Sequence, residues 1–210
     1  MMKHPFRLST ALVLGLVSVG CGSAVAQSET QAGGPSVRDS VNPADVRFMT
    51  DMIGHHSQAI LIAGWAPSHG ASPEVQTLAS RIVAGQKDDI VTMSNWLRDH
   101  GQSVPQHDTM HTRMAGMHHM MTMPGMLTPE QLTQLDQARG PEFDQLLLRF
   151  MIGHHEGALT MVNNLFGSRG AAQDQVVFQL ANIIQADQTT EIERMQKMLA
   201  KLLVEQWSSQ

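Results

Sequence analysis

The chain has 210 residues, a formal net charge of −5, 16 Met, 11 His and a single Cys. A net acidic chain without a basic cluster is a poor nucleic-acid binder, and one cysteine excludes an internal disulfide. A Met- and His-rich composition with almost no thiol points instead towards soft or borderline metal ions.

The first 26 residues read as a secretion signal. Lys3 and Arg7 supply positive charge, residues 8–19 form an apolar run too short to span a bilayer, and a small-x-small pattern ends at Ala26. We expect cleavage after Ala26, a periplasmic or secreted protein, and no transmembrane segment after cleavage. A lipoprotein attached through Cys21 and a retained membrane anchor are the alternatives.

Residues 27–41 are rich in Gly, Ser and Gln and predict a disordered tether before a helical domain over 42–207. Asn42 and Pro43 begin a helix that we expect to run to about Trp65. Ser72 and the following proline begin a second helix, which is expected to end near residue 100 before a glycine. Residues 42–101 therefore predict a first helical hairpin.

Residues 102–140 form a connector that lacks apolar periodicity until a short helix over about 128–138. Between residues 107 and 126 there is no Leu, Ile, Val, Phe or Trp from which a core could be built. The candidate metal ligands there are His107, Met110, His111, Met114, Met117, His118, His119, Met120, Met121, Met123 and Met126. Thioethers and imidazoles in this density predict metal capture, with a low-complexity linker or an adhesive surface as alternatives.

Residues 141–207 predict a second hairpin, with helices over about 141–166 and 172–205, and it repeats the first. The run Met-Ile-Gly-His-His occurs at 52–56 and again at 151–155. Around it, residues 45, 48, 52, 55, 56 and 59 align with positions 99 later, and residues 78, 79, 82, 86, 89, 90 and 93 align with positions 102 later. Two copies of one hairpin predict an all-α four-helix bundle with approximate two-fold symmetry.

Each His-His pair is a candidate metal site. Adjacent helical residues point about 100° apart, so one imidazole of a pair is expected to face the bundle axis and the other a neighbouring helix. A methionine lies three residues before each pair, which puts a thioether on the same face. The predicted ligands are Met52, His55, His56, Met151, His154 and His155, a set suited to Cu(I) or Ag(I), with Cu(II) or Zn(II) for the imidazoles alone.

Four polar residues interrupt the inner stripes of the second and fourth helices: Gln86, Asp89, Gln188 and Glu191. As partners of bound histidines they would orient the rings from outside the ligand set. They could instead satisfy His55 or His154 in a purely structural hydrogen-bond network without metal.

The repeated motif Asp-x-x-Phe-x-x-x-Met-x-x-His-His resembles the exported proteins of the domain of unknown function 305 family. The resemblance covers residues 45–96 and 144–198, departing from the family pattern at Asp89, where Glu is usual, and at Leu147, where Phe is usual. It implies a ferritin-like four-helix bundle. Some members are described as periplasmic copper-binding or copper-resistance proteins, which implies roles for the same six Met and His residues of the two motifs.

The leading functional prediction is an exported protein that sequesters or transfers Cu(I), with Ag(I) or Cu(II) possible and another copper carrier or an efflux protein as a partner. Two alternatives stay open. One is a ferritin-like metal oxidase, for which the inner stripes offer few carboxylates. The other is an envelope interaction module with a structural His and carboxylate core.

Overall fold

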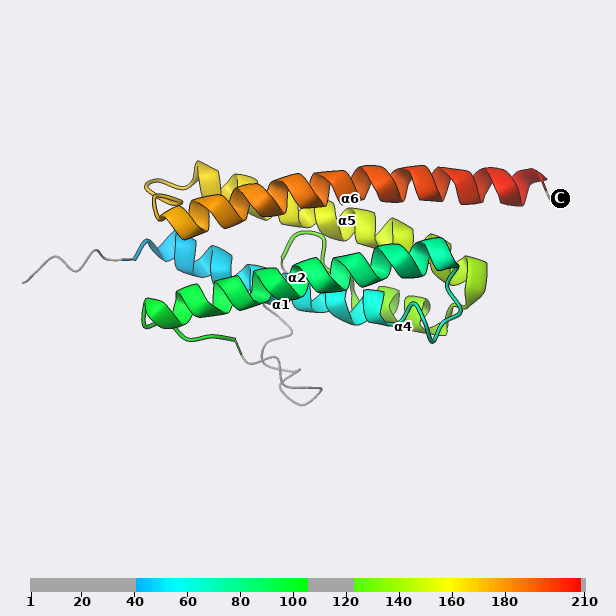
Figure 1. The fold of residues 1–210 in the computed structure, drawn as a ribbon, viewed down its shortest axis with the longest axis horizontal. Coiled ribbons are helices and arrows are strands. Elements are labelled where there is room, and N and C mark those ends of the chain that lie inside the picture. Colours follow the sequence, from blue (N-terminus) through cyan, green and yellow to red (C-terminus); the bar gives the residue numbers. More distant parts are fainter. Residues whose placement is uncertain (1–40, 106–122, 209–210) are drawn as a thin grey trace, which may run out of the picture. The chain divides into compact units, whose positions relative to one another are not determined.

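The computed structural model describes residues 41–105 and 123–208, and these residues form helices and no strands. The helices are α1 (Pro43–Gly64), α2 (Pro73–Asp99), α4 (Pro129–Gln137), α5 (Gly140–Gly167) and α6 (Gln175–Ser208) (Figure 1). The predicted signal, the tether and residues 106–122 of the connector lie outside the described residues. No helix of the described part is long and apolar enough to cross a membrane.

The helix starts follow the capping signals in the sequence. Asn42 accepts a hydrogen bond from the Ala44 N–H at 2.8 Å, and Ser72 accepts one from the Val75 N–H. Thr128 and Gln131 form a capping box at the start of α4. These side chains satisfy backbone N–H groups that the first helical turn leaves unpaired.

The start of α6 differs from the prediction by three residues. Ala172 has a φ of +54°, a left-handed conformation that cannot belong to a helix. The Asp174 side chain then accepts hydrogen bonds from the Val176 and Val177 N–H groups, so the helix begins at Gln175. The apolar periodicity alone did not reveal this loop conformation.

The helices pack as two hairpins, α1 with α2 and α5 with α6, and α1 also packs against α5. Two matched aspartates join the hairpins. Asp45 on α1 accepts the Ala172 N–H at 2.7 Å, and Asp144 on α5 accepts the Ser72 N–H at 3.1 and 3.2 Å. Each buried carboxylate therefore holds the loop of the opposite hairpin. The predicted all-α bundle of two repeated hairpins is confirmed.

The hydrophobic core is divided into two groups along the bundle. One group takes residues 48–53 of α1, 93–97 of α2, 158–165 of α5 and 177–184 of α6. The other takes members of residues 59–63, 75–82, 143–151 and 192–195 of the same helices. On each of these helices, the buried side chains between the two stretches are polar. The fold therefore places a central polar layer, built by all four long helices, between two apolar halves.

Candidate metal site

The four motif histidines form the centre of this polar layer and are almost completely buried. His55 on α1 and His154 on α5 lie against one another, with ring centroids 3.8 Å apart and planes inclined by 40°. Within each pair the rings are farther apart, at 6.4 Å for His55 and His56 and 6.2 Å for His154 and His155. The first histidine of each motif therefore faces the other hairpin, as the helical geometry predicts for one member of each pair.

The second histidine of each motif faces a carboxylate of its own hairpin. His56 lies 3.2 Å from Asp89 on α2, and His155 lies 2.7 Å from Glu191 on α6, in each case through Nε2. The purely structural alternative paired these carboxylates with His55 or His154, whereas in the structure they lie beside the second histidine of each motif. Asp89 and Glu191 approach from the outer helices, so they reach the histidines that turn outward.

The amides of the layer do not bind the histidines in the same way. Gln86 and Gln188 are each 3% exposed. Both amide atoms of Gln86 and the carbonyl oxygen of Gln188 have no hydrogen-bond partner in the described structure. Unpaired buried polar atoms lower the stability of the folded protein. The residues of this layer are therefore not selected for stability alone.

The hydrogen bonds fix which ring nitrogen carries the proton. A carboxylate or a carbonyl accepts only, so a neutral His56 or His155 donates through Nε2–H and keeps a lone pair on Nδ1. The Nδ1 atoms of His55, His56, His154 and His155 are all buried and without a partner among the described residues. The layer thus contains several inward imidazole nitrogens whose opposite nitrogens are oriented by oxygen acceptors.

Burial favours the neutral form of His55, His154 and His155. Desolvation, with the nearby His56, lowers the pKa of His55 to about 3. Desolvation also lowers the pKa of His154 well below its usual range, and that of His155, where Glu191 opposes the shift. At neutral pH each of these rings therefore carries one proton, which the acceptors at Nε2 hold away from Nδ1 in His55 and His155.

Thioethers flank the layer on both sides. Met52 and Met151 lie one helical turn before His55 and His154 and are buried. Met123 and Met126 are the described members of the Met-rich segment, the first buried and the second half-buried. The other candidates of that segment, His107, Met110, His111, Met114, Met117, His118, His119, Met120 and Met121, lie outside the described residues.

Residues 123–127, which we call the strap, cross the bundle at the histidine layer. The Pro124 carbonyl lies 3.0 Å from His55 Nε2. Gln58 holds the strap with two hydrogen bonds to Leu127, donating to its carbonyl at 3.2 Å and accepting from its N–H at 2.8 Å. Sequence reasoning missed Gln58 and the Pro124 carbonyl, although position 58 is a Gln where the second repeat has a Gly.

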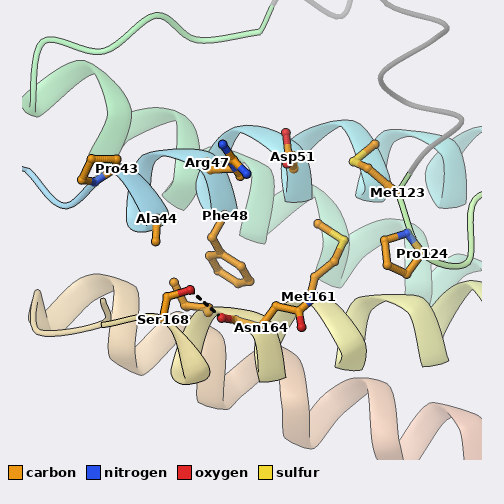
Figure 2. A pocket seen from close by; sticks show the side chains of 11 residues that line it. Pro43, Ala44, Arg47, Phe48, Asp51, Met123, Pro124, Met161, Asn164 and Ser168 are labelled. Carbon is orange, nitrogen blue, oxygen red and sulfur yellow. Dashed lines mark hydrogen bonds between the residues drawn. The ribbon is translucent and has the colours of Figure 1, made fainter. Parts of the chain in front are cut away.

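A cavity of about 420 Å³ opens beside the strap, between α1 and α5 (Figure 2). Met123 from the strap and Met161 from α5 both line it, and each is 8% exposed. Arg47 and Asp51 lie at its α1 side. At this cavity, Met123 and Pro124 of the strap lie close to solvent. Met161 was not among the predicted ligands.

Within residues 41–105 and 123–208, no three His, Cys, Asp or Glu side chains are grouped so that they could hold a metal ion. The four imidazoles and two carboxylates are arranged as pairs. Met52, Met151 and Met123 are the buried thioethers that could add sulfur to these pairs.

The fold and the residues of this site occur in a chain that matches a known protein family. A family model described as domain of unknown function DUF305 matches residues 45–199, and the chain belongs to this family. No curated protein matches the chain.

Solved structures of the family resemble the chain over most of its length. A DUF305 protein from Streptomyces coelicolor, described as a candidate secreted protein, is 28% identical, with a TM-score of 0.64 over 76% of this chain and 93% of that one. A DUF305 fragment from Deinococcus radiodurans is 25% identical, with a TM-score of 0.63 over 77% and 98%. CopM in its Cu(II)-bound form is 28% identical, with a TM-score of 0.58 over 75% and 96%. CopM has also been solved in Cu(I)-bound and Ag-bound forms.

Proposed function

We propose that this protein is an exported copper-binding protein that sequesters or hands on Cu(I), and that Ag(I) mimics it. The observation that carries the proposal is the set of buried, unpartnered Nδ1 atoms in the histidine layer. In metal sites the ligating imidazole typically gives its other N–H to a carboxylate or a backbone carbonyl. His56, His155 and His55 have this arrangement, with Asp89, Glu191 and Pro124 as the acceptors.

The donor chemistry favours a soft cation. Thioether and imidazole donors suit Cu(I), whereas the described residues lack the cluster of hard ligands that a di-iron site would use. Met52 and Met151 are buried members of the two motifs, and the side chain of the strap residue Met123 lies beside Gly54 of the first motif. The neutral state of the rings also helps, since a neutral imidazole keeps a lone pair for a metal ion at neutral pH.

The relatives support the same choice of metal. CopM, which is 25 to 28% identical to this chain in the forms compared, has been solved with Cu(I) and with Cu(II). The Streptomyces coelicolor relative is described as a candidate secreted protein, which agrees with the export predicted from residues 1–26. We propose that the Met/His-rich segment of residues 107–126 captures the ion, that the bundle holds it, and that another copper carrier or an efflux protein exchanges it.

A structural role for the layer is the second candidate. The bonds of His56 to Asp89 and of His155 to Glu191 need no metal, and such a network could simply specify the packing of four helices. This role does not account for the two ring nitrogens of His154, both of which are buried and unpartnered.

Titration of the purified protein with Cu(I) against a competing chelator tests the proposal. The matched control is a variant in which the seven methionines of residues 107–126 and Met52 and Met151 are replaced by leucine, which retains apolar volume but removes sulfur. We expect the native protein to take Cu(I) from a chelator that the control cannot deplete. Equal affinities for the two proteins would reject the proposed function. If the variant binds more weakly, a helical circular-dichroism spectrum like that of the native protein would show that the loss is not caused by unfolding.

A further inference from the structure

The strap crosses α1 and α5 at matched positions of the two repeats. Positions 54 and 153 are both Gly, whereas positions 58 and 157, also equivalent, are Gln and Gly. The side chain of Met123 lies over the first of these positions, with its Cε 3.6 Å from where a Cβ on Gly54 would be. The two repeats therefore have the same residue at positions 54 and 153, where a glycine leaves space for the strap, and different residues at positions 58 and 157.

This asymmetry has a clear structural consequence. On the α1 side, the Gln58 amide pairs with both backbone groups of Leu127. On the α5 side, a Cβ on Gly157 would overlap the Pro124 carbonyl and lie 2.7 Å from the Gly125 Cα. Helix α1 therefore binds the strap through Gln58, and helix α5 leaves space for it at Gly157. A second Gln at position 157 would exclude the strap, and a Gly at position 58 would leave it unattached.

The strap acts directly on one histidine. Pro124 offers only a carbonyl, so His55 Nε2 must carry the proton of the neutral ring, and Nδ1 must carry the lone pair. Apart from an interaction with the His55 backbone, His154, the repeat-related residue, makes no hydrogen bond through either ring nitrogen among the described residues. The same motif therefore gives an imidazole oriented by the strap in the first repeat and one without such a bond in the second.

We propose that Gln58 and Gly157 are positioning residues, which fix the Nε2–H tautomer of His55 through the Pro124 carbonyl and so preorganise its Nδ1 as a ligand. The ligand role rests on the copper function proposed above, whereas the tautomer does not. His154 then serves as the adaptable partner, because neither of its nitrogens is committed. The two motifs therefore contribute differently to one metal site: His55 as a preorganised ligand and His154 as an adaptable one.

The tautomer can be read in the metal-free protein from the ¹⁵N shifts of the histidine rings. The native protein gives a pyrrole-like Nε2 and a pyridine-like Nδ1 for His55. Gln58→Leu, which keeps volume but removes both bonds to Leu127, gives a mixture of tautomers for His55 while His56 and His155 stay unchanged. Gln58→Asn, with an amide too short to span the gap, provides a milder change of the same kind.

Gln76→Leu is the matched control, since Gln76 also donates to a backbone carbonyl, that of Ala71 at 2.7 Å, but far from the layer. It leaves the His55 tautomer as in the native protein. A folded Gln58→Leu or Gln58→Asn variant with an unaltered Nε2–H tautomer overturns the proposal, and so does an Nδ1–H tautomer in the native protein.

Copper binding separates this inference from the function. If the native protein binds Cu(I), Gln58→Leu lowers the affinity by about tenfold and Gln76→Leu does not, which is the loss typical of removing a group that orients a ligand. Equal affinities in the native protein and Gln58→Leu overturn the ligand role of the preorganised His55. A native protein that binds no Cu(I) rejects the proposed function instead, and the tautomer measurement still decides whether the strap controls His55.

Discussion

The two repeats share the Met-Ile-Gly-His-His motif, but the surroundings of the motif differ between them. Each contains a buried Met, two buried histidines and a carboxylate that accepts from the second histidine. In the described part of the chain, the strap, which belongs to neither repeat, binds the inward histidine of the first repeat through the Pro124 carbonyl and makes no such bond to His154. The comparison teaches that a duplicated helical hairpin sets up a symmetric site, and that the single connector between the copies makes the site asymmetric.

Acid should give the largest effect. The folded-state pKa of His55, about 3, and the lowered pKa of His154 lie below the value of about 6.5 in the unfolded chain, so the unfolded state binds more protons between these limits. The stability of the metal-free protein is therefore retained above pH 6.5 and decreases as the pH falls towards 3. Urea unfolding at a series of pH values measures this.

The double variant His55→Leu/His154→Leu tests whether these rings are the cause. We expect it to flatten the acid part of the stability curve, because the groups whose pKa values differ between the folded and unfolded states have been removed. An unchanged slope would assign the acid sensitivity to the carboxylates instead.

The next largest effect is on stability. It should distinguish Gly157, which faces the strap, from Gly153 one helical turn earlier. Gly157→Ala should cost about 2–3 kcal/mol, since its Cβ would overlap the Pro124 carbonyl and the main chain would have to move. Gly153→Ala places its Cβ where nothing lies within 4 Å, so it should be neutral or stabilising by up to about 1 kcal/mol. Thermal denaturation of both variants compares them, and equal destabilisation would mean that the strap is not held against α5.

Removal of each inward histidine separately should give opposite results. His55→Leu leaves the Pro124 carbonyl without a partner and should cost about 1–3 kcal/mol. His154→Leu removes a ring that has no partner, so it should be neutral or slightly stabilising while lowering Cu(I) affinity. If both substitutions destabilise the metal-free protein equally, the proposed inequivalence of the two motifs is wrong. Urea midpoints and chelator competition give the two quantities.

The smallest effect should come from the outer carboxylates. Glu191→Gln and Asp89→Asn keep an oxygen acceptor but lose the charge, so each should cost about 1 kcal/mol or less. The loss should be greater for Glu191, whose 2.7 Å contact with His155 is shorter than the 3.2 Å contact of Asp89 with His56. Chemical denaturation at neutral pH measures the difference, and a greater loss for Asp89→Asn would contradict this ranking.

Much of this architecture follows from local sequence signals. Asn42, Ser72 and Thr128 mark helix starts by themselves, and the repeated His-His motif indicates that two hairpins bury equivalent faces. The helical period also predicts that one histidine of each pair faces the other hairpin. It cannot say which one, because that depends on how the hairpins are rotated against each other.

The strap could not be predicted in the same way. Its contacts join residues 69 positions apart in the chain, such as Gln58 with Leu127, and no periodicity reports a loop that enters a helical interface. The difference between Gln58 and Gly157 at one repeat position was visible in the sequence, but its meaning required the position of Pro124. Most of the Met/His-rich segment lies outside the described residues, so its predicted role stays a prediction.

X-ray absorption at the copper edge tests the central claim most directly. The account predicts that the native protein loaded with one equivalent of Cu(I) shows both sulfur and imidazole nitrogen as nearest neighbours. It also predicts that the combined His55→Leu/His154→Leu variant shows weaker imidazole scattering while retaining sulfur. A native spectrum with only nitrogen and oxygen neighbours, or one that the two substitutions leave unchanged, would contradict a soft-cation site built from thioethers and the buried histidine layer.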